Sequence, residues 1–225
     1  MNPLLRRSAA HVFVESLSAP EITEADDHHL RRVLRLADGQ PVTLSDGDGG
    51  WCSARWSAAA GVQVDGPVFI EPLAVAQLTV GCAIPKGDRV ELVVSKLTEI
   101  GIDRVVLFET ARSVVRWGAE RQVKQLERLR RIAREAAAQS RRVRLPRVEL
   151  LTFRDAVALD GAVIAEPGAA GCIDVSVNTV LIGPEGGFDQ VELAAGGRTI
   201  GLGETVLRVE TAAIVAAACL IAWRN

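Results

Sequence analysis

The sequence lacks the features that mark several classes of protein. None of its four cysteines belongs to a Cys-x-x-Cys pair, so reduced and mostly buried thiols are expected. No apolar run reaches the roughly 18 residues that a membrane span needs, and the apolar stretch 212–223 is too short. The first residues also lack the long apolar core of a signal peptide. We therefore expect a cytoplasmic protein without a membrane partner.

Two common nucleotide-binding motifs are absent as well. The glycine-rich run 183–188 is not followed by Gly-Lys-Ser/Thr, which excludes a P-loop. The run 201–206 begins like a dinucleotide fingerprint, but Val206 stands in place of the third glycine, and only 19 residues follow it. That is too little chain for the rest of a βαβ unit, so a Rossmann oxidoreductase is disfavoured.

The net charge of −2 conceals a strong asymmetry. Residues 112–147 hold 12 basic and 3 acidic side chains, whereas the rest of the chain holds 14 basic and 25 acidic ones. A basic segment on an acidic background is typical of a surface that binds phosphate groups. Arginine outnumbers lysine along the whole chain, so that bias by itself is not evidence for RNA binding.

Residues 1–72 are predicted to form a small β-rich domain. A strand is expected at 11–14, and two alternating runs around the turn 46–50 predict a hairpin. A calcium loop is excluded in this turn, because the next ligand position falls on Gly50, the position of the turn glycine on Trp51, and that of the closing glutamate on Ser57. Pro67 and Pro72 limit the freedom of the following segment and indicate a domain joint, so a second domain is predicted over 73–225.

Within the first domain, residues 26–35 are predicted to form a short amphipathic helix with Leu30, Val33 and Leu34 facing inward. Three arginines would face outward, either as a solvated surface or as contacts to an RNA backbone: Arg31, Arg32 and Arg35. The neighbouring pair His28-His29 has no third ligand close in sequence, which favours a structural role over metal binding.

After residue 73 the pattern alternates between strands and helices. Strands are expected at 77–84, 104–108, 162–165, 179–182 and 199–202. Helices are expected over 90–100, ending at Gly101, and from 123 to about 140. Such alternation predicts an α/β domain with a parallel sheet. The last two strands both run into glycine-rich loops, which predicts one ligand pocket at the carboxyl edge of the sheet.

These loops also carry a resemblance to a known family. Gly183-Pro-Glu-Gly-Gly-Phe188, Leu202-Gly203 and Leu207-Arg208-x-Glu210-Thr211-Ala212 resemble the RsmE-type methyltransferases of the SPOUT superfamily. Further similar segments follow one another in the family's order: 28–35, 86–89, 96–101, 112–113 and 135–140. The resemblance therefore spans nearly the whole chain.

The resemblance implies a fold and an activity. Residues 1–72 would form a PUA-like RNA-binding β-barrel, and 73–225 an α/β SPOUT domain that ties a deep trefoil knot. The activity would be transfer of a methyl group from S-adenosylmethionine, without a metal, to N3 of a specific uridine in 16S ribosomal RNA. The resemblance also implies the 30S subunit as partner and a homodimer. A ribosome-associated RNA-binding protein that has lost turnover is the alternative.

In this interpretation the loops bind the cofactor through their main chain, with glycines allowing close approach and apolar residues forming the walls. The candidate cofactor-binding residues are Glu166, Leu181, Ile182, Gly183, Pro184, Glu185, Gly186, Leu202, Gly203, Leu207, Arg208, Thr211 and Ala212.

Two residues of the last motif are candidates for catalysis. Uracil N3 carries a proton at neutral pH, so transfer needs a base or a group that stabilises the ring anion. Arg208 is expected to stabilise that anion, because a guanidinium stays cationic and can contact two acceptors. Glu210 either positions Arg208 or acts as a helix-end anion or a base, or the two form a structural salt bridge. Glu204-Thr205 departs from the family's usual Pro-Arg, which leaves an RNA contact from that loop open.

The basic segment supplies the remaining candidates. Charged side chains on a helix usually only solvate it, but the surplus of nine positive charges in this segment favours contacts to RNA. The candidate RNA-binding residues here are Arg112, Arg121, Arg128, Arg131 and Arg141.

Overall fold

The computed structural model describes residues 2–224 and divides the chain into two compact units. The first unit combines the chain up to Ala74 with Arg134–Leu145, and the second combines Val75–Ala133 with the chain from Pro146 onward. Nothing in the sequence indicated that residues 134–145 join the first unit. The assignment of separate functions to 1–72 and 73–225 stays a prediction.

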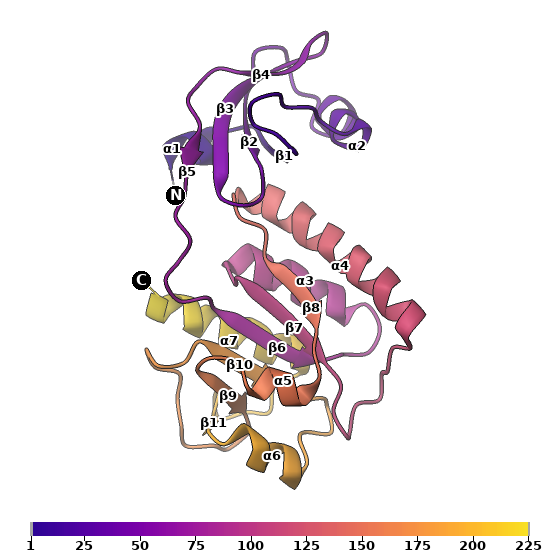
Figure 1. The fold of residues 1–225 in the computed structure, drawn as a ribbon, viewed down its shortest axis with the longest axis vertical. Helices are drawn as coiled ribbons and strands as arrows, with labels where there is room; N and C mark the ends of the chain where they lie inside the picture. The colour runs from indigo at the N-terminus through magenta and orange to yellow at the C-terminus, as the bar shows by residue number, and fades with distance from the viewer. Residues whose placement is uncertain (1, 225) are drawn as a thin grey trace. The chain divides into compact units, whose positions relative to one another are not determined.

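A five-stranded sheet forms the centre of the first unit (Figure 1). After the short helix α1 (Pro3–Arg7), its strands are β1 (Ala10–Phe13), β2 (Pro41–Ser45), β3 (Gly50–Ser57), β4 (Gly61–Val64) and β5 (Phe69–Ile70). Strands β2 and β3 are antiparallel and form the predicted hairpin, and β1 lies parallel to β2. Leu44, Cys52 and Trp56 are at most 1% exposed and pack in its core.

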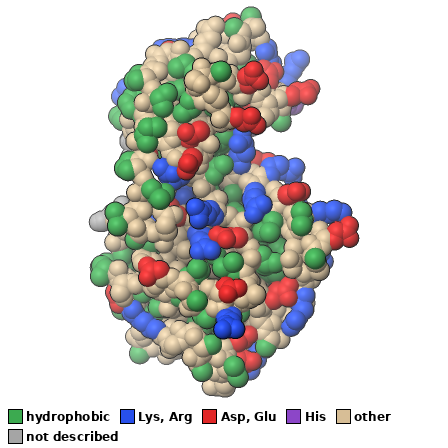
Figure 2. All heavy atoms as spheres, viewed as in Figure 1, with side chains coloured by type: hydrophobic (Ala, Val, Ile, Leu, Met, Phe, Trp, Pro, Cys, Tyr) green, Lys and Arg blue, Asp and Glu red, His purple; other side chains and the backbone are tan. Residues whose placement is uncertain are grey.

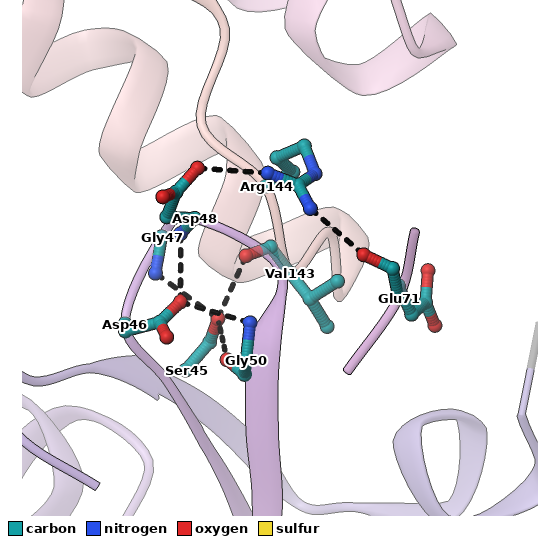
Figure 3. A network of polar contacts seen from close by, with 8 residues as sticks. All are labelled: Ser45, Asp46, Gly47, Asp48, Gly50, Glu71, Val143 and Arg144. Carbon is teal, nitrogen blue, oxygen red and sulfur yellow. Dashed lines mark hydrogen bonds and ion pairs between the residues drawn. The ribbon is translucent and has the colours of Figure 1, made fainter. Parts of the chain in front are cut away.

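The turn between β2 and β3 is closed by its own aspartate (Figure 3). Oδ1 of Asp46 accepts hydrogen bonds from the backbone N–H groups of Asp48, at 2.7 Å, and Gly50, at 3.0 Å. A short polar side chain that binds the main chain just after it is a common way to stabilise a tight turn. The predicted turn is confirmed.

The core of the first unit is completed by Val143, which comes from the far end of the basic segment. Val143 is 5% exposed and packs in one cluster with Leu5 and Trp51. Its carbonyl oxygen lies 2.7 Å from the hydroxyl of Ser45 at the end of β2 (Figure 3). Burial of the apolar side chain is favourable, and the hydrogen bond to the carbonyl oxygen avoids the cost of burying an unpaired polar group.

The next two residues fasten the same segment to the turn after β2. The N–H of Leu145 donates to the carbonyl of Gly47 at 2.9 Å. The guanidinium of Arg144 donates to Asp48 at 2.8 Å and to the backbone carbonyl of Glu71 at 2.7 Å (Figure 3). One arginine thus connects the hairpin turn to the end of the β5 segment.

The helix predicted around Leu30 is present but changes its geometry halfway. It begins as α2 (Glu24–His28) and continues as the π-helical turn η1 (His29–Val33). The N–H of Leu34 bonds to the carbonyl five residues before it, which makes the turn wider than an α-helical one. Leu30 is buried as predicted, but Val33 and Leu34 are 60% and 41% exposed. The prediction that these two face inward is wrong, because it assumed an α-helical period.

A six-stranded parallel sheet forms the centre of the second unit (Figure 1). In chain order its strands are β6 (Thr79–Ala83), β7 (Arg104–Phe108), β8 (Arg147–Leu150), β9 (Ala162–Ala165), β10 (Thr179–Ile182) and β11 (Thr199–Ile200). Their order in the sheet is β11-β9-β10-β6-β7-β8. The predicted parallel α/β sheet is confirmed. The edge strand β8 was not predicted, because four residues with two charges among them give little hydrophobic signal.

Helices cover both faces of this sheet (Figure 1). They are α3 (Arg89–Ile100), α4 (Ala119–Ser140), α5 (Phe153–Val157), α6 (Gln190–Gly196) and α7 (Val209–Arg224). Along β10, Val180 and Ile182 join the core beneath α3 and α7, whereas Leu181 joins the core beneath α5 and α6. Helix α3 ends at Gly101, as predicted, with a φ of 112° that favours glycine.

The long helix α4 belongs to both units, since its last residues, from Arg134, are part of the first. Within the second unit, Leu129 and Ala133 face the core, whereas Val123 near the beginning of the helix is 58% exposed. Within the described chain, none of the helices combines the length and the apolar character that a bilayer crossing requires.

Candidate active site

A cavity of about 300 Å³ lies where three neighbouring strands of the parallel sheet end. The chain leaving β9 contributes residues 165–167, the chain leaving β10 contributes most of 182–188, and the connection from β11 to α7 contributes most of 202–209. Ligands of open α/β sheets bind at the carboxyl ends of the strands. The prediction of one pocket at this edge, formed by both glycine-rich loops, is confirmed.

Ten of the thirteen residues predicted to bind the cofactor lie around this cavity. They are Glu166, Ile182, Gly183, Pro184, Glu185, Leu202, Gly203, Leu207, Arg208 and Ala212. The lining also includes residues that were not predicted: Ala165, Pro167, Gly187, Phe188, Thr205, Val206 and Val209. Each of these lies within two residues of a predicted one, so extending each predicted segment by two residues would have included them.

The other three predicted residues lie outside the lining. Leu181 is fully buried with Phe108 on the opposite face of the sheet, so the prediction that it forms a wall of the pocket is wrong. Side chains alternate along a strand, and of this pair only Ile182 can face the cavity. Gly186 and Thr211 are exposed, on the outside of the glycine-rich loop and on the first turn of α7.

The connection from β11 to α7 offers its main chain to a ligand. Within the described chain, residues 202–207 form no hydrogen bonds between their backbone groups and other backbone groups. Gly203 has a φ of 147°, and a Cβ added there would meet no atom within 4 Å. Backbone N–H and C=O groups that lack partners beside a cavity are ready-made donors and acceptors.

Charged groups are placed at the edge of an otherwise mainly apolar cavity. Two carboxylates, of Glu166 and Glu185, and one guanidinium, of Arg208, belong to its lining. Among residues 2–224, Arg208 has no hydrogen-bond or ion-pair partner, and it is exposed. A cation held without a partner beside a cavity can attract an anionic group of a ligand or a substrate.

Glu210 is close to the cavity but does not line it. Its Oε1 lies 3.9 Å from Nε of Arg89, and Nη1 of the same arginine lies 3.2 Å from Oε1 of Glu185. The second oxygen of Glu210 is buried and has no partner within the described residues. The alternative of a structural Arg208–Glu210 salt bridge is wrong, because Arg89 takes the place of Arg208. The segment 86–89 was matched in the sequence, but this role for Arg89 was missed.

Comparison with known proteins shows the family to which the chain belongs. The sequence profile of an RNA methyltransferase domain matches residues 71–221, and that of an RNA methyltransferase PUA domain matches residues 22–59. Ribosomal RNA small subunit methyltransferase E of Mycobacterium tuberculosis is 32% identical over 88% of this chain and 84% of its own. The protein of that name from Bacillus subtilis is 28% identical over 90% of each chain. The chain belongs to the ribosomal RNA small subunit methyltransferase E family.

Solved structures of similar proteins agree with this family. Ribosomal RNA small subunit methyltransferase E of Neisseria gonorrhoeae, bound to S-adenosylmethionine, matches 93% of this chain and 95% of its own with a TM-score of 0.74 at 26% identity. A Legionella pneumophila methyltransferase, also with that cofactor bound, matches 96% and 98% with a TM-score of 0.78 at 25% identity. The methyltransferase E family thus accounts for both units of the chain.

Most arginines predicted to bind RNA are exposed, and several have protein partners. Nε of Arg31 lies 2.6 Å from Oδ2 of Asp27, and its guanidinium stacks over the ring of Trp56. Nη2 of Arg128 lies 2.7 Å from Oε1 of Glu91. Exposed candidates are Arg32, Arg35, Arg121 and Arg131. On the face drawn in Figure 2, Arg and Lys side chains are interspersed with Asp and Glu. RNA binding by these residues stays a prediction.

Arg141 is held inside the first unit. Its side chain donates to the hydroxyl and carbonyl of Ser8, to the carbonyl of Ala9, and to the carbonyls of Ala138 and Gln139, at 3.0 to 3.3 Å. These bonds occupy all five N–H donors of a guanidinium. The geometry therefore contradicts the prediction that Arg141 contacts phosphates, because none of its donors is left for a phosphate oxygen.

Proposed function

We propose that this chain transfers the methyl group of S-adenosylmethionine to N3 of a specific uridine in 16S ribosomal RNA. Membership of the methyltransferase E family supports cofactor-dependent methylation of small-subunit ribosomal RNA. The observation that carries the proposal is the cavity at the ends of β9, β10 and β11, with an unpaired Arg208 at its edge. The choice of N3 as the methylated atom goes beyond what family membership supports and belongs to the proposal.

The residues of the cavity fit S-adenosylmethionine chemically. Ile182, Leu202 and Leu207 supply apolar surface, and the unpaired main chain of 202–207 supplies donors and acceptors for the edge of an adenine ring. Glu166 and Glu185 add negative charge to the lining, which would suit the cationic parts of the cofactor. When bound, the cofactor supplies a methyl group on a sulfonium, an electrophile that requires no metal.

We assign Arg208 to the uracil ring. Its guanidinium is free to donate hydrogen bonds to a carbonyl oxygen beside N3, and it would stabilise the ring anion that forms when N3 loses its proton to solvent. Arg89 joins Glu210, at the start of α7, to Glu185 in the glycine-rich loop, and this bridge connects two segments that contribute to the lining of the cavity. Glu210 is thus assigned to positioning rather than to proton transfer.

We also propose the finer features of the fold. A trefoil knot is supported by the path of the chain, since α7 follows the edge strand β11 but packs on α3, β6 and β10. A PUA-like barrel over 1–72 is supported by the five-stranded sheet and by the family profile over 22–59. A homodimer is supported by α7, an apolar helix on which Trp223 is 55% exposed. We infer a cytoplasmic enzyme that acts within the 30S subunit.

The deciding experiment uses labelled S-adenosylmethionine and 30S subunits from a strain that lacks this methylation. Transfer to one uridine, mapped to N3 by mass spectrometry, is expected. Free 16S ribosomal RNA as a parallel substrate distinguishes the naked RNA from the assembled subunit. Binding of RNA and subunits without transfer would favour the alternative of a non-catalytic ribosome-associated protein, and methylation of another ring atom would contradict the N3 assignment alone.

A further inference from the structure

The glycine-rich loop that follows β10 is contacted from outside the cavity by the loop that follows β7. Nη1 of Arg112 donates to the backbone carbonyl of Gly186 at 2.9 Å and to that of Phe188 at 3.2 Å. Phe188 lines the cavity, whereas Arg112 does not. Arg112 therefore binds the outer side of a segment whose inner side forms the wall of the cavity.

A buried carboxylate ties the same two loops together. Glu192, at the start of α6, is 9% exposed. Its Oε1 accepts a hydrogen bond from the N–H of Ala111 at 2.7 Å, and its Oε2 accepts one from the N–H of Asp189 at 2.9 Å. Asp189 in turn accepts from the N–H of Glu192 at 2.8 Å, which completes a capping box. Glu192 thus joins the residue just before Arg112 to the residue just after Phe188.

The loop between these anchors has little intrinsic rigidity. Gly186 and Gly187 follow one another, and Gly187 has a φ of 67°. Glycine loses more conformational freedom on ordering than any other residue, so this order must be imposed by contacts. Within the described chain, the turn bond from the N–H of Gly187 to the carbonyl of Pro184 and the exposed ion pair of Glu185 with Arg89 also restrain this loop, but the two bonds from Arg112 are the ones that hold the carbonyl groups of Gly186 and Phe188.

We propose that Arg112 is a positioning residue for the cofactor: it fixes the glycine-rich loop in the shape that binds S-adenosylmethionine, and it is not a phosphate contact. This inference rests on the proposed function. A loop that is ordered before the ligand arrives costs less free energy to close around it, so loss of Arg112 weakens cofactor binding without removing any group that touches the cofactor.

The test compares Arg112→Ala with Arg154→Ala. Arg154, on α5, is an exposed arginine outside the cavity, and its side chain makes no hydrogen bond or ion pair within the described chain. Calorimetry should show S-adenosylmethionine binding to Arg112→Ala roughly 10-fold or more weakly than to the parent, the range expected from losing hydrogen bonds with a charged donor. Arg154→Ala should bind like the parent. Arg112→Lys, whose ammonium is charged but on a shorter side chain, should recover part of the loss.

Two further measurements separate positioning from other roles. Hydrogen exchange in the peptide 183–189 should accelerate in Arg112→Ala, with the rest of the second unit unchanged, and should return to the parent rate at saturating cofactor. In steady-state methylation, KM for S-adenosylmethionine should rise by a larger factor than kcat falls. Uniformly faster exchange across the unit would show a general structural role and overturn the proposal.

RNA binding supplies the opposing outcome. The slope of log affinity against log salt should be the same in Arg112→Ala and the parent. A slope reduced by about 0.7 to 0.9 with unchanged cofactor affinity would make Arg112 a phosphate contact and overturn the proposal. A parent protein that binds no S-adenosylmethionine would overturn the proposed function instead, whereas normal parent binding with normal Arg112→Ala binding would overturn only the inference about Arg112.

Discussion

Glu210 pairs with Arg89 of helix α3, although Arg208 is only two residues away in the sequence. Because Arg89 also contacts Glu185, one guanidinium joins the beginning of α7 to the glycine-rich loop. The carboxylate of Glu210 does not line the cavity, and its nearest charged partner draws it toward α3. This geometry is the basis for treating Glu210 as a positioning residue.

Glu210→Gln should therefore keep most of the methylation rate. The amide preserves the shape of the side chain and loses only a long, partly exposed ion pair, which is worth less than about 1 kcal/mol or roughly fivefold. Single-turnover methylation measured across a range of pH should give a profile like that of the parent. A loss of most activity together with a missing ionisation in the pH profile would identify Glu210 as the base.

Arg208→Lys should methylate far more slowly while binding S-adenosylmethionine nearly as well as the parent. Lysine keeps the charge but loses the planar pair of donors, and removing a positioned charge-stabilising donor typically costs on the order of 100- to 1000-fold in turnover. Single-turnover methylation and calorimetry together measure the two effects, with Arg154→Lys as the control. Near-normal turnover would mean that backbone N–H groups stabilise the anion.

Gly203→Val should abolish S-adenosylmethionine binding while the protein remains folded. The φ of 147° at Gly203 is costly for any side chain, by about 1–3 kcal/mol, and the new methyl groups would occupy the open space at the cavity. Gly39→Val is the matched control, since Gly39 has a φ of 81°, also has open space, and lies in the first unit. The control should lose thermal stability without losing cofactor affinity; parent-like binding in Gly203→Val would contradict main-chain recognition at this position.

Arg121 and Arg141 should respond in opposite ways to alanine substitution. Arg121 is exposed, so its loss should lower the salt slope of RNA binding by about 0.7 to 0.9 and leave stability unchanged. Arg141 holds Ser8, Ala9 and the end of α4, so its loss should lower the melting temperature and leave the slope unchanged. Salt titrations and thermal melts of both variants would check this. An unchanged slope in Arg121→Ala would make that arginine part of a solvated surface.

The first unit should lose stability in mild acid because of His11. Its ring is 4% exposed, Nδ1 lies 2.8 Å from Oγ1 of Thr43, and burial with the nearby Arg141 lowers the pKa of His11 from 6.5 to about 4. The unfolded chain therefore binds the proton first, and stability present above pH 6.5 is lost progressively toward about pH 4. The loss should be on the order of 3 kcal/mol. Urea unfolding of the parent and His11→Gln at several pH values measures it, and an equally steep acid loss in the variant would exclude His11 as the cause.

Local patterns in the sequence predicted the sheet and the position of the cavity. The run Thr179–Ile182 is apolar on both faces because helices cover both, and the glycines that follow it leave a strong signal for a loop at the strand end. The resemblance to the methyltransferase family in the last fifth of the chain then predicted which residues of these loops bind the cofactor.

Contacts between residues far apart in sequence could not be predicted in this way. Nothing local distinguishes Arg112, which binds two carbonyl groups more than 70 positions away, from Arg121, which is exposed and makes no such bonds. The prediction that Val33 and Leu34 face inward failed for a different reason. It assumed one helical geometry throughout, whereas the chain forms a π-helical turn at Leu30. Val143 shows a third limit of prediction from sequence. It is a single valine after a long basic helix, and nothing in the neighbouring sequence indicates that it packs in the core of the first unit.

The junction formed by Val143 and Arg144 also bears on how this protein could evolve. Recombination that exchanged only the chain up to Ala74 would deliver a sheet without the valine that packs beside Trp51 and without the arginine that joins Asp48 to Glu71. The amino-terminal unit is therefore not a transferable cassette. Its inheritance is linked to that of the end of α4, so insertions or deletions at Arg134–Leu145 should be selected against as strongly as changes within the hairpin itself.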